Sequence, residues 1–188
     1  MPDEDFTELA GDRVVLRRFH PGDAGKFVEY RSSPEVARFQ SWDAPYPREA
    51  ADRFIRQIMK EHPDTAGEWF QFAVALGAAG QLIGDCAAIP DANDPRQCEI
   101  GFTIASEYQG QGYATEAARL LVGYLITGRG KHRITARCDP RNVASVAVLE
   151  RLGMRREGHL RESTWAKGEW TDDLLYALLH HEWHPQSR

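Results

Sequence analysis

A short segment with two glycines, residues 109–114 (Gln-Gly-Gln-Gly-Tyr-Ala), has the residue types and spacing to bind an anion. Apolar residues alternate along 99–104 before it, which predicts a half-buried strand. Polar positions recur every three or four residues along 115–126 after it, which predicts a mostly buried helix. A helix start offers free N–H groups and partial positive charge, and glycines let a phosphate approach the backbone. The N–H groups of 110–115 and the Thr115 hydroxyl are therefore candidate phosphate donors.

The local pattern leaves the identity of the phosphate ligand open. No Gly-Lys-Ser or Gly-Lys-Thr follows the turn, so it is not the phosphate loop of nucleotide hydrolases. The dinucleotide pattern GxGxxG is half present, because residue 115 is threonine instead of the third glycine. An ordinary tight turn before a helix also fits these residues.

The wider sequence carries a resemblance to a known family. Gln109-x-x-Gly112-x-Ala114 resembles the acetyl-CoA signature of the Gcn5-related N-acetyltransferase (GNAT) superfamily. Further segments resemble, in the same order, the RimJ/RimL branch, which acetylates N-termini of ribosomal proteins. These segments are Glu99–Phe102, Gln109–Ala117, Asn142–Ser145, Leu152–Met154, Glu157–Arg161 and Trp170–Asp173. The match is strong over 99–183, whereas the N-terminal half agrees only in its pattern of elements.

The resemblance implies a fold, a cosubstrate and most of a binding site. The fold is α/β (α+β), with a central mixed, mostly antiparallel twisted sheet flanked by helices, as one N-acetyltransferase domain over residues 1–188. The cosubstrate is acetyl-CoA, its pyrophosphate held by Gln109, Gly110, Gln111, Gly112, Tyr113, Ala114 and Thr115. The strand at Thr103 and Ile104 would bond the pantetheine arm and diverge from its neighbour, leaving the Ile104 N–H as an oxyanion donor. Asn142 would bond pantetheine, and Ser145 would donate a proton to sulfur.

Acetyl transfer also needs a base for the acceptor amine. Glu99 is the leading candidate because it shares a strand face with Gly101 and Thr103, and it would need burial or a water relay to act at neutral pH. An edge carboxylate paired with a surface arginine is the alternative interpretation. Asp85 and Glu162 are weaker candidates on neighbouring strands.

Two basic groups could meet the 3′-phosphate of CoA. Arg129, Lys131 and His132 form one cluster, for which a solvated loop is an alternative, and Arg155 and Arg156 form the other. Asn142 and Ser145 likewise have a purely structural interpretation, as a helix cap and a polar residue one turn further on.

Composition narrows the class of protein. The 188 residues are 42% hydrophobic with a net charge of −5, which fits one core and argues against direct nucleic-acid binding. The sequence has neither a signal peptide nor a membrane span, so we expect a cytoplasmic protein. Three scattered cysteines, together with histidines at 180, 181 and 184, predict reduced thiols and surface imidazoles; no metal is expected. Residues 180 and 181 are expected on a strand.

The remaining elements follow from periodicity and breakers. Strands are expected at 13–19, 68–76, 81–89, 133–138, 157–164 and 172–183, and helices at 21–31, 47–61 and 142–153. An aromatic loop at 38–46 and a turn at 77–80 connect them. Phe39 and Trp42 in this loop either bind a ligand or close the edge of the core.

These observations predict an acetyl-CoA-dependent N-acetyltransferase in which a primary amine attacks the thioester directly. The acceptor is expected to be the N-terminal α-amine of a protein such as a ribosomal protein. A small amine, such as an antibiotic or polyamine, is the alternative acceptor, and a CoA-binding module without turnover is the alternative class. The resemblance alone allows a homodimer; no residue pattern points to one.

Overall fold

The computed structural model describes residues 6–77 and 80–184. Its strands are β1 (Glu8–Ala10), β2 (Val14–Arg17), β3 (Phe70–Leu76), β4 (Gln81–Pro90), β5 (Gln97–Ile104), β6 (Arg133–Cys138), β7 (Arg155–Ala166) and β8 (Glu169–Leu179). Its α-helices are α1 (Ala24–Arg31), α2 (Pro34–Ala37), α3 (Arg48–Ile58), α4 (Tyr113–Gly123) and α5 (Val143–Arg151). A π-helical turn, Tyr124–Gly128, extends α4, and short 3-10 turns lie at Pro21–Asp23, Ser106–Tyr108 and His180–Glu182.

The strands form one eight-stranded sheet in the order β1-β2-β3-β4-β5-β6-β8-β7. All neighbouring pairs are antiparallel except β5 and β6, which run parallel. Helix α4 lies in the β5–β6 connection, as a parallel pair requires a crossover. The expected mixed, mostly antiparallel sheet is confirmed.

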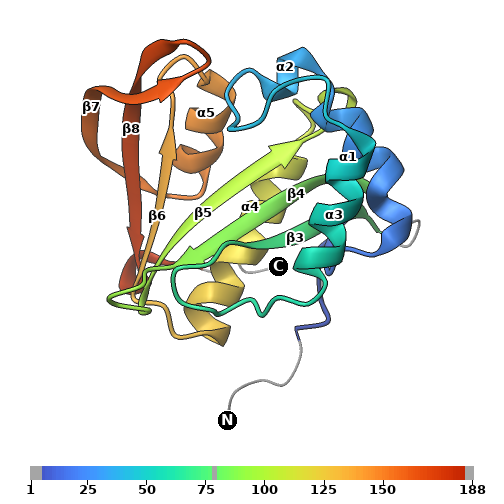
Figure 1. Ribbon diagram of the computed structural model, residues 1–188. Helices are drawn as coiled ribbons and strands as arrows, with labels where there is room; N and C mark the ends of the chain where they lie inside the picture. The colour runs from blue at the N-terminus through green and yellow to red at the C-terminus, as the bar shows by residue number, and fades with distance from the viewer. Residues whose placement is uncertain (1–5, 78–79, 185–188) are drawn as a thin grey trace.

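Helices cover the sheet on both faces (Figure 1). Helices α4 and α5 lie behind it and bury one apolar cluster, which includes Ile100 of β5 and Leu121 of α4. Helices α1 and α3 lie in front of β3 and β4 and bury a second cluster around Phe27. Alternation along β5 follows from this arrangement, since Cys98 and Ile100 are buried toward α4 while Glu99 faces the other side. None of the helices in residues 6–77 and 80–184 has the length and apolar composition of a membrane-spanning segment.

Element boundaries differ from expectation by a few residues at most elements, and some differences are larger. The short elements β1 and α2 were not predicted, because three or four residues carry too little periodicity. The last strand was predicted to reach residue 183 but ends at Leu179, because Glu182 accepts a hydrogen bond from the Leu179 N–H and closes a turn. Histidines 180 and 181 therefore lie in a 3-10 turn, so the expected strand placement is wrong. The predicted turn at 77–80 includes residues 78–79, which lie outside the described residues.

Candidate active site

A cavity of about 480 Å³ opens where the end of β5, the start of α4, the start of α5 and the segment after α2 meet. It brings together most of the residues that the sequence singled out. The predicted residues that line it are Thr103, Ile104, Gln109, Gly110, Gly112, Tyr113, Ala114, Thr115, Asn142 and Ser145. Figure 1 shows the end of β5 below α2, with α5 to the left of both, at the upper end of the sheet.

The turn before α4 has the backbone of an anion-binding loop. Gly110 and Gly112 have φ of 74° and 85°, left-handed values that glycine adopts without a steric penalty. Gly112 is the N-cap of α4, and the first helical hydrogen bond runs from the Glu116 N–H to the Gly112 carbonyl. Within the described part of the chain, the N–H groups of residues 110–115 donate to no protein acceptor. Six adjacent donors are therefore available at the positive end of a helix.

Glutamine side chains fix this loop from within. The Gln109 Nε2 donates to the Ile104 carbonyl at 2.8 Å, which ties the loop to the end of β5. The Gln111 Nε2 donates to the Glu107 carbonyl at 3.0 Å, and Gln111 is not among the described residues that line the cavity. The structure thus gives both amides a structural contact, and the backbone provides the free donors.

Thr115 supplies a further polar atom at the same place. Its Oγ1 is buried and has no hydrogen-bond partner among the described residues. A buried hydroxyl without a partner costs free energy of about 1–3 kcal/mol, so such an atom points to a ligand. Thr115 lines the cavity at the third position of α4. The residues present therefore suit an anionic group such as a pyrophosphate.

Strands β5 and β6 separate beside the cavity. Their parallel pairing ends at Glu99 and Thr135, and beyond it the two strands diverge (Figure 1). The Ala105 N–H donates to the Ile83 carbonyl, and alternation along the antiparallel ladder then turns the Ile104 N–H away from β4. The Ile104 N–H consequently faces the opening between β5 and β6.

A close approach of β4 supports the backbone at this point. A Cβ atom at Gly84 would lie 2.1 Å from the Thr103 carbonyl oxygen and 3.0 Å from the Ile104 Cα. Only glycine allows β4 to lie this near to β5. Gly84 therefore helps to set the position of the two residues predicted to meet the pantetheine arm.

Helix α5 places Asn142 and Ser145 on the opposite wall. The Asn142 Oδ1 accepts a hydrogen bond of 3.2 Å from the Ser145 N–H, so Asn142 caps the helix as its structural interpretation predicts. Both residues also line the cavity, and the Asn142 Nδ2 keeps its donors. Within the described residues the Ser145 hydroxyl has no hydrogen-bond partner, so it is available to a ligand.

Glu99 lies on β5, three residues before Phe102, the first residue of that strand to line the cavity. Its side chain is 32% exposed and lies 3.6 Å from the Arg137 Nε, which agrees with the alternative interpretation as a carboxylate paired with arginine. Burial raises the pKa of Glu99 above its ordinary value, Arg137 opposes this rise, and Asp173 adds to it. The Glu99 carboxyl group is thus ion-paired with Arg137, and its pKa is shifted toward neutral pH.

The two weaker base candidates are less available. Asp85 is 3% exposed, accepts a 2.5 Å hydrogen bond from the Tyr30 hydroxyl and lies 3.6 Å from Arg31. Glu162 is exposed at an irregularity of β7, where its N–H donates to Asp172. Asp85 is fully engaged in a buried network, and Glu162 lies on an exposed strand.

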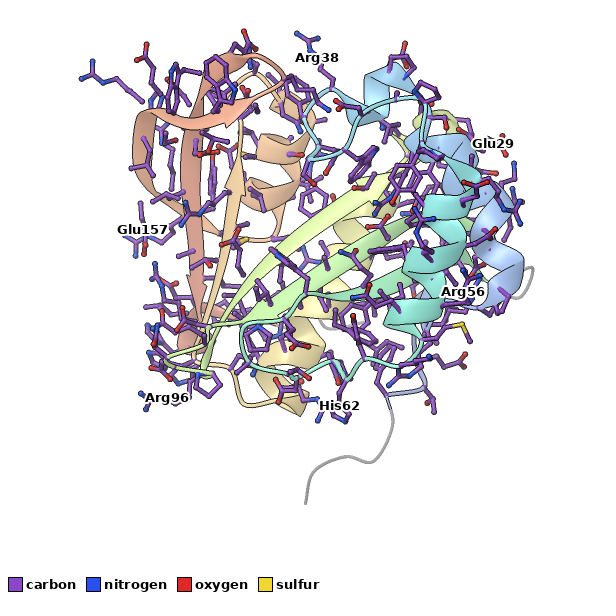
Figure 2. All side chains as sticks on the ribbon, viewed as in Figure 1. Glu29, Arg38, Arg56, His62, Arg96 and Glu157 are labelled. Atoms are coloured by element: carbon purple, nitrogen blue, oxygen red, sulfur yellow. The ribbon has the colours of Figure 1, made fainter. Side chains whose placement is uncertain are left out.

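The basic cluster considered for the 3′-phosphate lies at the wrong end of the molecule. Lys131 is 3% exposed and donates to Asp64 and to the Pro95 carbonyl. Figure 2 shows His62 and Arg96, neighbours of these partners, at the lower end, whereas Arg38 marks the end near α2. The alternative pair also lies away from the cavity, since Arg155 is bonded to Glu182 at the start of β7.

Two arginines that sequence reasoning missed line the cavity instead. Arg141 lies just before α5 and pairs with Asp139 and Glu169, while Arg151 ends α5. A basic residue in the last turn of a helix is too common a pattern to mark a site.

In the aromatic loop at 38–46, one aromatic residue lines the cavity and the other packs inside the protein. Phe39 lines the cavity together with Val36 of α2. Trp42 instead packs on Arg31, whose guanidinium lies 3.9 Å from its ring centroid, and it donates to the Arg31 carbonyl. Phe39 is therefore on the ligand side, and Trp42 fixes the loop.

The described cysteines and histidines form neither a reactive thiol nor a metal site. Burial raises the pKa of Cys98 to about 12 and that of Cys138 to about 11, and it raises that of Cys86 further. The thiols are therefore protonated at neutral pH and unsuited to nucleophilic catalysis. Among residues 6–77 and 80–184, no three His, Cys, Asp or Glu side chains gather as metal ligands.

Comparison with known proteins identifies the family. A profile described as acetyltransferase (GNAT) domain matches residues 13–155. The uncharacterized N-acetyltransferase YnaD of Bacillus subtilis is 32% identical over 171 residues, which are 91% of this chain and 96% of that protein. The ribosomal protein uS5-alanine N-acetyltransferase of Escherichia coli is 28% identical over 190 residues, covering 95% of this chain and 94% of that protein.

A crystal structure of a GNAT-family acetyltransferase from Bacillus anthracis is similar throughout, with a TM-score of 0.84 at 28% identity. The similarity covers 94% of this chain and 100% of that one. Sequence family, sheet order and the strand–loop–helix site thus agree. The chain belongs to the GNAT family and is an N-acetyltransferase.

Proposed function

We propose that this protein binds acetyl-CoA in the cavity and transfers the acetyl group to the N-terminal α-amine of a protein. The proposal that acetyl-CoA binds in the cavity rests mainly on one observation. The unpartnered N–H groups of 110–115 lie in the same cavity as the diverging end of β5 and the start of α5. This is the layout needed for a ligand whose pyrophosphate and thioester lie at opposite ends of a pantetheine arm.

The donors divide along the length of the ligand. Residues 110–115 would hold the pyrophosphate, with Thr115 Oγ1 as an added donor. Thr103, Ile104 and the Asn142 amide would hold the pantetheine arm. Arg141 and Arg151 contribute positive charge to the same cavity. Acetyl-CoA supplies an activated carbonyl and a thiolate leaving group.

The chain's residues would then assist three events at the thioester. The acceptor nitrogen attacks the carbonyl carbon, forming the C–N bond as the C–S bond breaks. Glu99, directly or through a water, would take the proton from the amine, and the Ile104 N–H would stabilise the oxyanion. Ser145 would hydrogen-bond the departing thiolate, which then takes up a proton from solvent, while Glu99 returns the amine proton to solvent.

The protein N-terminus as acceptor is supported by similarity. The E. coli relative, aligned over 95% of this chain, is named for the alanine of ribosomal protein uS5. Its alignment includes the N-terminal half, where residues of α2 and of the loop after it line the cavity. An α-amine also suits a half-buried carboxylate base such as Glu99, because its pKa is lower than that of a lysine.

A thiol-release assay with acetyl-CoA tests the proposal. The acceptor panel comprises peptides starting with Ala, Ser or Met, N-terminally blocked copies of each, polyamines and aminoglycosides. Release with an unblocked peptide, and an acetyl group located at its α-amine by mass spectrometry, is the expected result. Thiol release with a small amine alone would show that the acceptor is a small amine and not a protein N-terminus, and the acetyl-transfer chemistry would stand.

Gly112→Glu tests the binding half independently of the acceptor. The substitution forces a side chain onto a φ of 85° and adds a negative charge among the phosphate donors. We expect calorimetry to show no acetyl-CoA binding, with an unchanged far-UV spectrum. An unchanged affinity for acetyl-CoA would show that the loop at 110–115 does not bind the pyrophosphate.

A further inference from the structure

Arg13 reaches the phosphate loop from a distant part of the chain. It lies just before β2, 98 residues from Gln111, yet its Nη1 donates to the Gln111 carbonyl at 2.9 Å. Its guanidinium carbon lies 4.7 Å from the ring centroid of Tyr113, the first residue of α4. Its Nε donates to Glu116 Oε2 at 2.8 Å. One side chain thus contacts the loop before, at and after the helix start.

The same guanidinium also packs against Gly112. A Cβ atom at this position would lie 3.2 Å from the Arg13 Nη2, so the bare Cα leaves room for the arginine. Gly110 and Gly112 both have positive φ, and glycines have the largest conformational freedom to lose on folding. A loop of this kind needs outside contacts to keep one conformation, and Arg13 provides three of them.

Arg13 also neutralises a charge that would oppose an anion. Glu116 lies in the first turn of α4, beside the phosphate donors. Its Oε1 accepts from the backbone N–H groups of Arg13 and Val14, at 2.7 and 3.1 Å. These contacts direct the carboxylate toward β2, and the guanidinium compensates its charge.

We propose that Arg13 is the positioning residue of the phosphate loop. It holds residues 111–113 so that their N–H groups point at the pyrophosphate, and it cancels the charge of Glu116. Its planar fork can serve Gln111 and Glu116 together while stacking on Tyr113, which a lysine cannot do. The proposal rests on the proposed binding of acetyl-CoA. It requires that Arg13 matter to the pyrophosphate end of the ligand and not to the pantetheine arm.

Competition binding with two probes tests this requirement. CoA and pantetheine, which lacks the pyrophosphate, each displace a fluorescent CoA analogue from wild type, Arg13→Ala and Arg13→Lys. We expect Arg13→Ala to weaken CoA binding about tenfold, on the scale of a charge-assisted hydrogen bond, and Arg13→Lys to restore only part of it. Pantetheine affinity should stay constant. Arg48→Ala, which removes an exposed pair with Asp52 on α3, is the matched control and should alter neither probe.

The ratio of the two affinities separates positioning from a general loss of structure. A merely stabilising role for Arg13 would reduce the folded fraction and weaken both probes by the same factor, which would overturn the proposal. Equal CoA affinity in wild type and Arg13→Ala would also overturn it. If Arg13→Ala does not fold, Arg13→Lys gives the same ratio with a smaller change. Wild type that binds no CoA would reject the proposed function itself, a result distinct from wild-type binding that is insensitive to Arg13.

Discussion

At the scale of single residues, the site combines groups that already have protein partners with groups that have none. Asn142 caps α5 and Gln109 anchors the loop, while Ser145 Oγ and Thr115 Oγ1 make no hydrogen bond within the described residues. Unpartnered polar atoms in a cavity are the ones a ligand can satisfy. Ser145 is such a group, whereas Glu99 is ion-paired with Arg137.

Ser145→Ala should slow turnover and leave cosubstrate binding intact. A hydrogen bond to a departing thiolate strengthens only as charge develops on sulfur, so its loss lowers kcat by roughly tenfold. We expect the calorimetric Kd for acetyl-CoA to stay within about twofold of wild type. Ser145→Thr keeps the hydroxyl and serves as the control. An unchanged kcat in Ser145→Ala would dismiss the assigned role.

Glu99 should set the acidic limb of the pH–rate profile. The group acts as a base only when ionised, so activity falls as pH drops through its pKa, which burial has raised. Arg137 opposes that rise, so Arg137→Ala should move the limb to higher pH. Glu99→Gln should lower kcat/KM by about a hundredfold and abolish the limb. Identical profiles in wild type and Glu99→Gln would assign the base elsewhere.

At the scale of elements, the site depends on two strands that separate and two that come unusually close. Strands β5 and β6 part after Glu99, which opens the cavity. Strand β4 approaches β5 through Gly84, which fixes the backbone of Thr103 and Ile104 beside the opening. The separation of β5 and β6 and the approach of β4 to β5 are both backbone features. Substitutions at these places should therefore change acetyl-CoA binding by moving the backbone, and not by removing a side chain that contacts the ligand.

Gly84→Ala should force β4 and β5 apart. Its Cβ would lie 2.1 Å from the Thr103 carbonyl oxygen, so we expect the free energy of unfolding to fall by about 1–3 kcal/mol. The acetyl-CoA Kd should rise in the folded variant, because Thr103 and Ile104 shift. Gly25→Ala in α1, where nothing lies within 4 Å of the added atom, is the control and should leave both quantities unimpaired. Urea denaturation and calorimetry measure the two effects.

At the scale of the whole molecule, ion pairs join parts of the chain that are distant in sequence. Arg13 and Glu116 link β2 to α4, and Lys167 at the β7–β8 turn pairs with Asp43 in the loop after α2. Figure 1 shows this turn and this loop side by side above the sheet. Such pairs make the assembled site sensitive to pH, although each exposed pair contributes little alone.

Stability should fall at acidic pH. Glu116 is partly buried, which acts to raise its pKa, but hydrogen bonds from Arg13 and Val14 outweigh this and hold the pKa below its ordinary value of 4.5. Hydrogen bonds from Arg141 lower the pKa of Asp139 likewise. A lowered folded-state pKa contributes stability above the unfolded value, and that contribution disappears as pH falls through the folded value. We expect a lower urea midpoint at pH 3 than at pH 7, and a smaller difference in Glu116→Gln. Equal differences in both proteins would contradict the role given to Glu116.

The sequence by itself determined the parts of the site that depend on neighbouring residues. The Asn142 cap is a local property, and the structure has it where the pattern predicts it. A helix follows the two glycines as expected, although α4 begins at Tyr113, two residues before the periodic pattern at 115–126. Strand alternation likewise put Glu99 on the face opposite Ile100. The resemblance of the same segments to the GNAT family supplied the sheet and the chemistry around them.

Only the tertiary structure decided which side chains that are distant in sequence contact the site. The order of the strands places Arg137 beside Glu99, and the length of α5 brings Arg151 to the cavity. Folding carries Lys131 to the opposite end of the molecule, although it stands nearer in sequence to the phosphate loop than Arg151 does. Arg13 reaches Gln111 across 98 residues. These contacts follow from long-range strand pairing and helix packing, and no local pattern of residue types encodes them.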